Sequence, residues 1–132
     1  MKFCKKTRYG LTALVDLAAQ PSTTPVALKT IAERNDISLQ FLEHIFASFR
    51  RTGIVKSVKG SQGGYNLAKA ADEITVASVV EALEGSYHLE DEDVLVVDSV
   101  NQELDQILSN LTLAQMSGYY SDHYDKQEMY YI

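Results

Sequence analysis

Residues 35–67 read NDISLQFLEHIFASFRRTGIVKSVKGSQGGYNL, and this stretch decides the fold. Asn35-Asp36-Ile37 predicts a tight turn after a short helix. Ser38 is well suited to cap the next helix, with Ile37 before the cap and Leu42 four residues after it as a hydrophobic staple. A helix, a three-residue turn and a capped helix together predict a helix-turn-helix.

The capped helix is expected to be amphipathic. Its apolar residues fall at helical spacing and predict a buried face made of Leu42, Ile45, Phe46 and Phe49. The opposite stripe is polar and basic at one end, and consists of Gln40, His44, Ala47 and Arg51.

A β-hairpin is predicted directly after this helix. Gly53 ends the helix, and residues 54–58 alternate as a strand should. Residues 59–64 form a glycine-rich turn, and Tyr65-Asn66-Leu67 returns as a second strand. The hairpin has a basic tip, as a wing beside a helix-turn-helix would.

Further helices flank this stretch on both sides. Apolar residues at helical spacing from Tyr9 to Ala18 predict a first helix, which Pro21 and Pro25 end. A short helix carrying Leu28, Ile31 and Ala32 on one face follows it. After the hairpin, Thr75 caps a helix that stops at Gly85.

The last part of the chain predicts a long amphipathic helix after an acidic loop over residues 86–93. Thr112 is expected to cap a brief final turn, and the tail beyond Gly118 is tyrosine-rich and aperiodic. The three-and-four spacing of the long helix is close to a coiled-coil seam. We expect its apolar residues to mediate self-association: Val97, Val100, Leu104, Ile107, Leu108 and Leu111.

Charge divides the chain of 132 residues into two parts. Residues 1–69 hold 11 of the 12 Lys and Arg residues against four acidic residues, a net charge of +7, whereas residues 70–132 carry −13. The front part therefore has the electrostatic footprint of a polyanion binder, although incidental surface charge is the alternative. The fold class expected is mainly α with a small β-hairpin: a winged helix-turn-helix DNA-binding domain (1–85), an acidic loop and dimerisation helix (86–116) and a flexible tail (117–132).

Several classes of protein are excluded by composition. The longest aliphatic run is Val94–Val97, so we expect neither export nor a membrane span, but a cytoplasmic protein. The single cysteine, Cys4, excludes an internal disulfide and any multi-thiolate metal site within one chain. His88 lies in the acidic loop, but it has no second histidine nearby and no calcium-loop pattern, so a solvated loop is favoured over a metal site. No catalytic arrangement is evident, and we expect no cofactor and no enzyme activity.

The candidate DNA-contacting residues lie on three predicted elements. They are Lys5, Lys6, Arg8 and Tyr9 on the first helix; Ser38, Gln40, Phe41, Glu43, His44, Arg50 and Arg51 on and before the capped helix; and Lys56, Lys59 and Gly60 in the wing. The Lys and Arg residues among them are expected to neutralise DNA phosphates. The alternative is that they are ordinary surface charges. On the capped helix, Gln can form hydrogen bonds with adenine, Glu can accept a hydrogen bond from cytosine, and Arg can bind guanine or phosphate. The other interpretation is that this face of the helix is simply exposed to solvent. Phe41 suits either a thymine methyl group or the edge of the core.

Three motifs carry a resemblance to a known family. They are Lys6-Thr7-Arg8-Tyr9-Gly10, residues 37–43 (ISLQFLE) and residues 58–65 (VKGSQGGY). Over about residues 1–116 the chain resembles the winged-helix repressor family that includes IscR, NsrR and CymR. Cluster-binding members have three cysteines in the stretch matching residues 86–103, whereas this chain has none there, so the resemblance implies no iron-sulfur cluster. Lys59 and Thr7 stand where many relatives have arginine and glycine, which implies a weaker minor-groove preference.

Within that family the chain is most similar to the cluster-free members typified by CymR. The acidic segment and a tail that ends in Met129, Tyr130, Tyr131 and Ile132 carry this likeness. It implies a repressor of sulfur and cysteine genes whose tail docks on cysteine synthase. The predicted self-association of the long helix adds the expectation of a homodimer bound to a pseudo-palindromic operator in double-stranded DNA. A tail without a partner is the other interpretation. The alternative function is a regulatory protein that binds and modulates such an enzyme, with DNA binding secondary.

Overall fold

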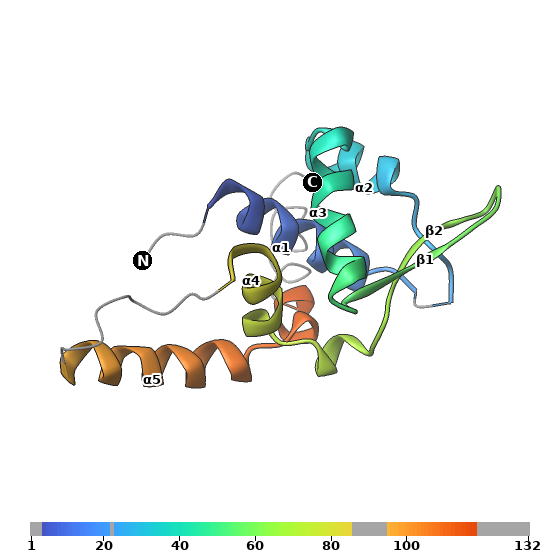
Figure 1. The fold of residues 1–132 in the computed structure, drawn as a ribbon. Coiled ribbons are helices and arrows are strands. Elements are labelled where there is room, and N and C mark those ends of the chain that lie inside the picture. The colour runs from blue at the N-terminus through green and yellow to red at the C-terminus, as the bar shows by residue number, and fades with distance from the viewer. Residues whose placement is uncertain (1–3, 22, 86–94, 119–132) are drawn as a thin grey trace, which may run out of the picture.

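The computed structural model describes residues 4–21, 23–85 and 95–118 (Figure 1). The elements follow in the order α1 (Lys5–Ala18), α2 (Leu28–Asn35), α3 (Leu39–Arg51), β1 (Val55–Val58), β2 (Gly64–Leu67), η1 (Ala71–Glu73), α4 (Val76–Glu84) and α5 (Leu95–Asn110). Residues 113–118 add a last helical segment. The expected fold class, helices with one small hairpin, is confirmed. No helix among the described residues is long and apolar enough to cross a membrane.

The turn between α2 and α3 forms as its sequence predicts. α2 ends at Asn35, and Asp36 adopts the left-handed conformation with φ of 53°. Ser38 then caps α3, because its Oγ accepts a hydrogen bond from the Phe41 backbone N–H at 3.3 Å. The cap satisfies one of the unpaired N–H groups that begin every helix, and so fixes where α3 starts.

The main apolar core lies between α1, α2, α3 and α4. The predicted buried face of α3, which is Leu42, Ile45, Phe46 and Phe49, is fully buried there. The Phe46 ring also meets the Tyr65 ring edge-on, with 5.1 Å between centroids. Because Tyr65 belongs to β2, this contact fastens the hairpin to α3.

The hairpin is antiparallel, pairs Val55 with Leu67 and Val58 with Gly64, and projects from the helices as an arm (Figure 1). A further pairing was not predicted from the sequence. Val26, in the loop before α2, exchanges two backbone hydrogen bonds with Tyr65, at 3.0 and 2.8 Å. The base of the hairpin is therefore held by this loop as well as by α3.

A buried carboxylate joins α1 to α2. The Asp16 side chain is almost fully buried, and it accepts hydrogen bonds from Arg34 Nε at 2.9 Å and from Asn35 Nδ2 at 2.6 Å. A buried charge is tolerated when it is paired and hydrogen-bonded, as here. The first helix of the helix-turn-helix is thus fixed against α1 by polar as well as apolar contacts.

The C-terminal end of α5 packs on α4 in a second apolar cluster, formed by Val76, Ala77, Val80 and Leu108. Backbone hydrogen bonds fasten the same region, from the Val76 N–H to the Leu111 carbonyl at 2.8 Å and from the Leu113 N–H to the Ile74 carbonyl at 3.0 Å. The N-terminal part of α5 extends away from the other helices (Figure 1).

This packing corrects one expectation about α5. Leu108 was expected in the self-association seam, but it is only 8% exposed and belongs to the core of its own chain. Leu111 is half-buried against the same cluster. The reason is that α4 offers an apolar face to the end of α5, which helical spacing alone could not reveal.

The Thr112 cap is confirmed, since its Oγ1 accepts a hydrogen bond from the Gln115 N–H at 3.2 Å.

Candidate nucleic-acid interface

The polar stripe of α3 faces solvent. Gln40, Glu43, His44 and Arg51 are all exposed, on the side of the helix away from its buried face. Ala47, in the middle of the stripe, is exposed as well, so the stripe has a small side chain at its centre. A helix of this length, about 20 Å, with a polar exposed face fits the major groove of B-DNA.

Basic residues of α1 lie beside the first turn of α3. The Lys5 ammonium lies 5.4 Å from the centroid of the Tyr9 ring, and Tyr9 meets Phe41 of α3 edge-on at 5.8 Å. Lys5 and Arg8 are exposed, and Lys6 is half-buried. The structure therefore places Lys5 and Tyr9 near the end of α3 from which a recognition helix contacts bases.

Phe41 is held on the core side of this contact. Its ring is half-buried and packs on the main core together with Tyr9. The ring thus lies at the edge of the core, and a contact between its exposed part and a thymine methyl group stays a prediction.

An unpredicted carboxylate stabilises the beginning of α1. Glu84, at the end of α4, accepts a hydrogen bond from the Cys4 backbone N–H at 2.8 Å. Burial alone would raise the pKa of Glu84, but hydrogen bonds from Cys4 and Thr7, with the nearby charge of Lys6, outweigh burial and lower that pKa below its usual value. Because the first turn of α1 contains no acidic residue of its own, Glu84 supplies the negative charge that favours a helix N-terminus.

The wing carries the predicted cations on its surface. Lys56 and Lys59 are exposed, and Gly60 at the tip has φ of 115°, a conformation that favours glycine. Arg50 and Arg51, in the last turn of α3, are exposed close to the start of β1, and Arg51 donates a hydrogen bond to Ser48 Oγ at 3.2 Å. The predicted residues thus lie near both ends of α3: Lys5 and Tyr9 near its N-terminus, and Arg50, Arg51 and the wing at its C-terminus.

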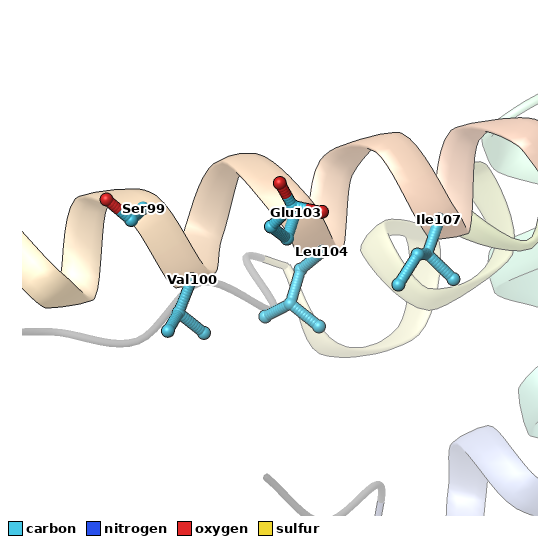
Figure 2. Close-up of a pocket in the computed structure, with 5 residues that line it drawn as sticks. All are labelled: Ser99, Val100, Glu103, Leu104 and Ile107. Carbon is cyan, nitrogen blue, oxygen red and sulfur yellow. The ribbon is translucent and has the colours of Figure 1, made fainter.

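An apolar ridge runs along the part of α5 that extends from the molecule. We define it as Val100, Leu104 and Ile107, which lie on one side of the helix with Ser99 and Glu103 beside them (Figure 2). Val100 is 39% and Ile107 55% exposed, while Leu104 is half-buried and packs against the second apolar cluster of its own chain. Val97 precedes the ridge by one turn, but its side chain lies outside the described part of the structure.

Metal ligands do not gather in the described part of the chain. No group of three or more His, Cys, Asp or Glu residues that could hold a metal ion occurs there. Cys4, the single cysteine of the sequence, is at the start of α1 and is hydrogen-bonded through its backbone to Glu84. This donor set does not fit a cluster that needs several thiolates from one chain. His88 and the acidic loop lie outside the described residues, as does the tail from Met129 to Ile132.

Comparison with known sequences confirms the resemblance carried by the motifs. The profile of one family, Rrf2, described as an iron-dependent transcriptional regulator, matches residues 3–118. The chain is 34% identical to the HTH-type transcriptional regulator CymR of Bacillus subtilis, over 139 residues that cover 100% of both chains. It is 45% identical to the HTH-type transcriptional regulator IscR of Erwinia tasmaniensis over 86 residues, which cover 65% of this chain and 52% of that protein.

Solved structures agree with these relatives. The structure is similar to that of CymR (YrzC), the global cysteine regulator of B. subtilis, with a TM-score of 0.83 and 32% identity, covering 90% of this chain and 98% of that one. It is also similar to IscR of T. potens, with a TM-score of 0.77 and 39% identity, covering 88% and 85% of the two chains. The winged helix-turn-helix predicted from residues 35–67 is confirmed by both likenesses.

Proposed function

Since this chain belongs to the Rrf2 family of transcriptional regulators, we propose that it is a homodimeric repressor that binds a pseudo-palindromic operator in double-stranded DNA. The observation that carries this proposal is the exposed polar stripe of α3, set between two groups of cations. A regulator of chromosomal genes works beside the chromosome, so we place it in the cytoplasm.

The exposed residues of α3 supply the base contacts in this proposal. Gln40 pairs its amide with an adenine, Glu43 accepts from a cytosine amino group, and His44 bonds a neighbouring base edge. Arg51 binds guanine or phosphate at the far end of the stripe. Phe41 supports this face by packing on Tyr9, and Ser38 fixes the first turn.

Phosphate contacts position the helix in the groove. The cations at both ends of α3 neutralise phosphates on either side of it: Lys5, Lys6 and Arg8 at one end, and Arg50, Lys56 and Lys59 at the other. The net charge of +7 on residues 1–69 supports this, because such contacts provide most of the affinity of a DNA-binding protein.

The ridge on α5 supports the dimeric state. Apolar side chains that are exposed at helical spacing on an extended helix fit the same row on a second copy. A two-fold dimer presents two copies of α3 about 34 Å apart, one turn of B-DNA, which calls for a pseudo-palindromic site.

The genes under control are, in this proposal, those of sulfur and cysteine metabolism. Similarity to CymR along the full chain supports the assignment, because the similar solved structure is described as the global cysteine regulator. The regulator acts without an iron-sulfur cluster, since a single cysteine cannot supply the ligands. The alternative, an enzyme-modulating protein in which DNA binding is secondary, has no support from these relatives, which are named as transcriptional regulators.

A contact with cysteine synthase belongs to the proposal as its least supported element. It rests on the resemblance to CymR and on the apolar, tyrosine-rich sequence of residues 129–132. Titration of purified synthase with the full chain and with a chain lacking Ile132 tests this, and equal affinities would remove the contact from the proposal.

Two substitutions test the DNA-binding roles. Glu43→Ala should relax base preference at one position of each half-site, because it removes a base contact. Lys59→Ala should weaken binding to all sequences alike and reduce the slope of log affinity against log salt by about one ion per protomer. The measurement is a mobility-shift titration at several salt concentrations. Equal and sequence-independent losses from both substitutions would contradict the assigned roles.

A further inference from the structure

Leu39 is an exposed leucine at the first position of α3. Among the described residues the exposed large apolar side chains are Leu39, Val58, Val100 and Ile107. The last two belong to the α5 ridge, whereas Leu39, 37% exposed, and Val58, 38% exposed, lie on the recognition helix and on the wing. Of these two, Leu39 lies in the first turn of α3, next to the residues proposed to read bases, whereas Val58 lies on the hairpin.

Leu39 differs from Phe41 in its packing. Phe41 packs on the main core and on Tyr9, so its ring is already engaged within the chain. Leu39 is in neither of the two apolar clusters, nor among the partly buried side chains packed against them in the described part of the chain. The sequence offered Phe41 as a candidate for a thymine methyl group; Leu39, in the same first turn of α3, is the more exposed of the two side chains.

The position of Leu39 on the helix adjoins the polar stripe. Residues of an α-helix are about 100° apart, so Leu39 lies about 40° from Glu43 and about 100° from Gln40 around the axis of α3. The Ser38 cap fixes the backbone of this first turn. The N-terminal residues of a recognition helix are those that reach base edges in the major groove.

We propose that Leu39 determines part of the sequence specificity, by packing against the 5-methyl group of a thymine in the major groove beside the bases read by Gln40 and Glu43. The thymine methyl is the apolar group that base edges present in that groove, so it is the partner that an exposed leucine selects. The proposal rests on the proposed function, in which α3 enters the major groove.

Replacement of thymine by uracil tests the contact, because uracil lacks only this methyl group. The wild-type protein first selects a duplex from a randomised library, and each thymine of that duplex is then replaced singly by uracil. One position in each half-site should lose about fourfold in affinity, the value expected for one buried methyl-sized group. The Leu39→Ala variant should bind the uracil duplex and the original thymine duplex with equal affinity. The Leu39→Met variant should again bind the thymine duplex more tightly than the uracil duplex.

Val58→Ala serves as the matched control. Val58 is exposed to the same degree and lies on the wing, so this variant should keep the full uracil penalty of the wild type. Thermal unfolding of each variant confirms that the fold is intact, as expected for exposed side chains.

Three results would overturn the proposal. The first is a wild-type affinity that no single uracil weakens, and the second is a penalty that Leu39→Ala retains in full. Both leave DNA recognition by α3 standing and show that Leu39 contacts sugar or solvent instead. The third is a wild-type protein that selects no sequence at all, which would overturn the proposed function together with this role.

Discussion

Gly10 determines how closely α1 can approach α3 and α4. A Cβ atom at this position would lie 2.7 Å from Leu83 Cδ1 and 3.0 Å from Phe49 Cζ, and both side chains are buried. Glycine costs a helix interior about 1 kcal/mol relative to alanine. Its presence inside α1 therefore follows from the close approach of the helices, not from helix propensity.

Enlarging Gly10 should destabilise the fold. We predict that Gly10→Val lowers the free energy of unfolding by about 3 kcal/mol, because the added atoms have no space, and that Gly10→Ala lowers it by about 1 kcal/mol. Urea denaturation measures both values. Gly118→Ala is the control, since among the described residues no atom beyond its own chain neighbours and helix backbone lies within 4 Å of its Cβ position, and it should leave the stability unchanged or slightly raised. A Gly10→Val variant as stable as its parent would contradict the packing argument.

Glu84 links stability to pH at the level of one residue. Its pKa is lower in the folded chain than in the unfolded chain, so its contribution is present above the unfolded pKa, near 4.5, and is lost as pH falls through the folded pKa. We predict that Glu84→Gln lowers stability at pH 7 by about 0.5 kcal/mol, a small value because the group is only partly buried, and reduces the loss of stability on acidification. The measurement is thermal unfolding between about pH 3 and pH 7, a range that includes the ordinary carboxyl pKa and extends below it.

The control for this experiment is Glu81→Gln, an exposed residue on the same helix. It removes one carboxylate without touching the start of α1. If both variants changed the acid dependence equally, the hydrogen bond to Cys4 would not be the cause.

The helix α5 has two parts that differ in their packing: a C-terminal end buried on α4 and an exposed ridge. Its C-terminal end is buried on α4 through Leu108, while Val100 and Ile107 are exposed on the ridge. A substitution at Leu108 would therefore damage the core of one chain as well as any interface. The ridge residues allow the interface to be tested alone.

Charges on the ridge should prevent self-association without unfolding the chain. We predict that Val100→Asp with Ile107→Asp yields folded monomers whose DNA affinity falls to that of a single half-site. Sedimentation and circular dichroism measure the two properties. Gln102→Asp with Gln106→Asp adds the same charge at exposed positions on another side of α5 and should remain dimeric. If the Val100→Asp, Ile107→Asp variant still sediments as a dimer, the ridge does not mediate self-association.

Elements whose signals are local could be predicted from the sequence. The caps at Ser38 and Thr75 and the hairpin of residues 55–67 depend on neighbouring residues, and the structure contains all three. Contacts between distant positions were missed: Glu84 lies 80 residues from Cys4, and Arg34 lies 18 residues from Asp16. Helical spacing gave the apolar face of α5 but not its partner, so Leu108 was assigned to the wrong surface.

For the candidate site, the sequence predicted which residues are exposed on α3 and in the wing, because amphipathic spacing defines both faces of a helix. It left the role of Phe41 open, since that depends on Tyr9 from another helix. It did not single out Leu39, because a leucine at this position is ordinarily expected to be buried.

For the whole molecule, the two-fold arrangement sets the spacing of the operator. We predict that an insertion of about 5 base pairs between the half-sites, half a turn of B-DNA, reduces affinity to that of one half-site, because the second copy of α3 then faces the wrong side of the duplex. The same insertion outside the half-sites should have no effect. Mobility-shift titration of the three duplexes measures the difference, and equal affinities for all of them would contradict a dimer of fixed geometry.

The joint between α5 and the start of α4 is made by main-chain atoms, through the hydrogen bonds of Val76 with Leu111 and of Ile74 with Leu113. The side chains at these positions are buried or half-buried, and none of them belongs to the ridge. Substitutions along the ridge can therefore change which chains pair, while the direction in which α5 leaves the molecule is kept. After gene duplication, two copies of such a regulator can cease to form mixed dimers within one cell and still require the same distance between half-sites.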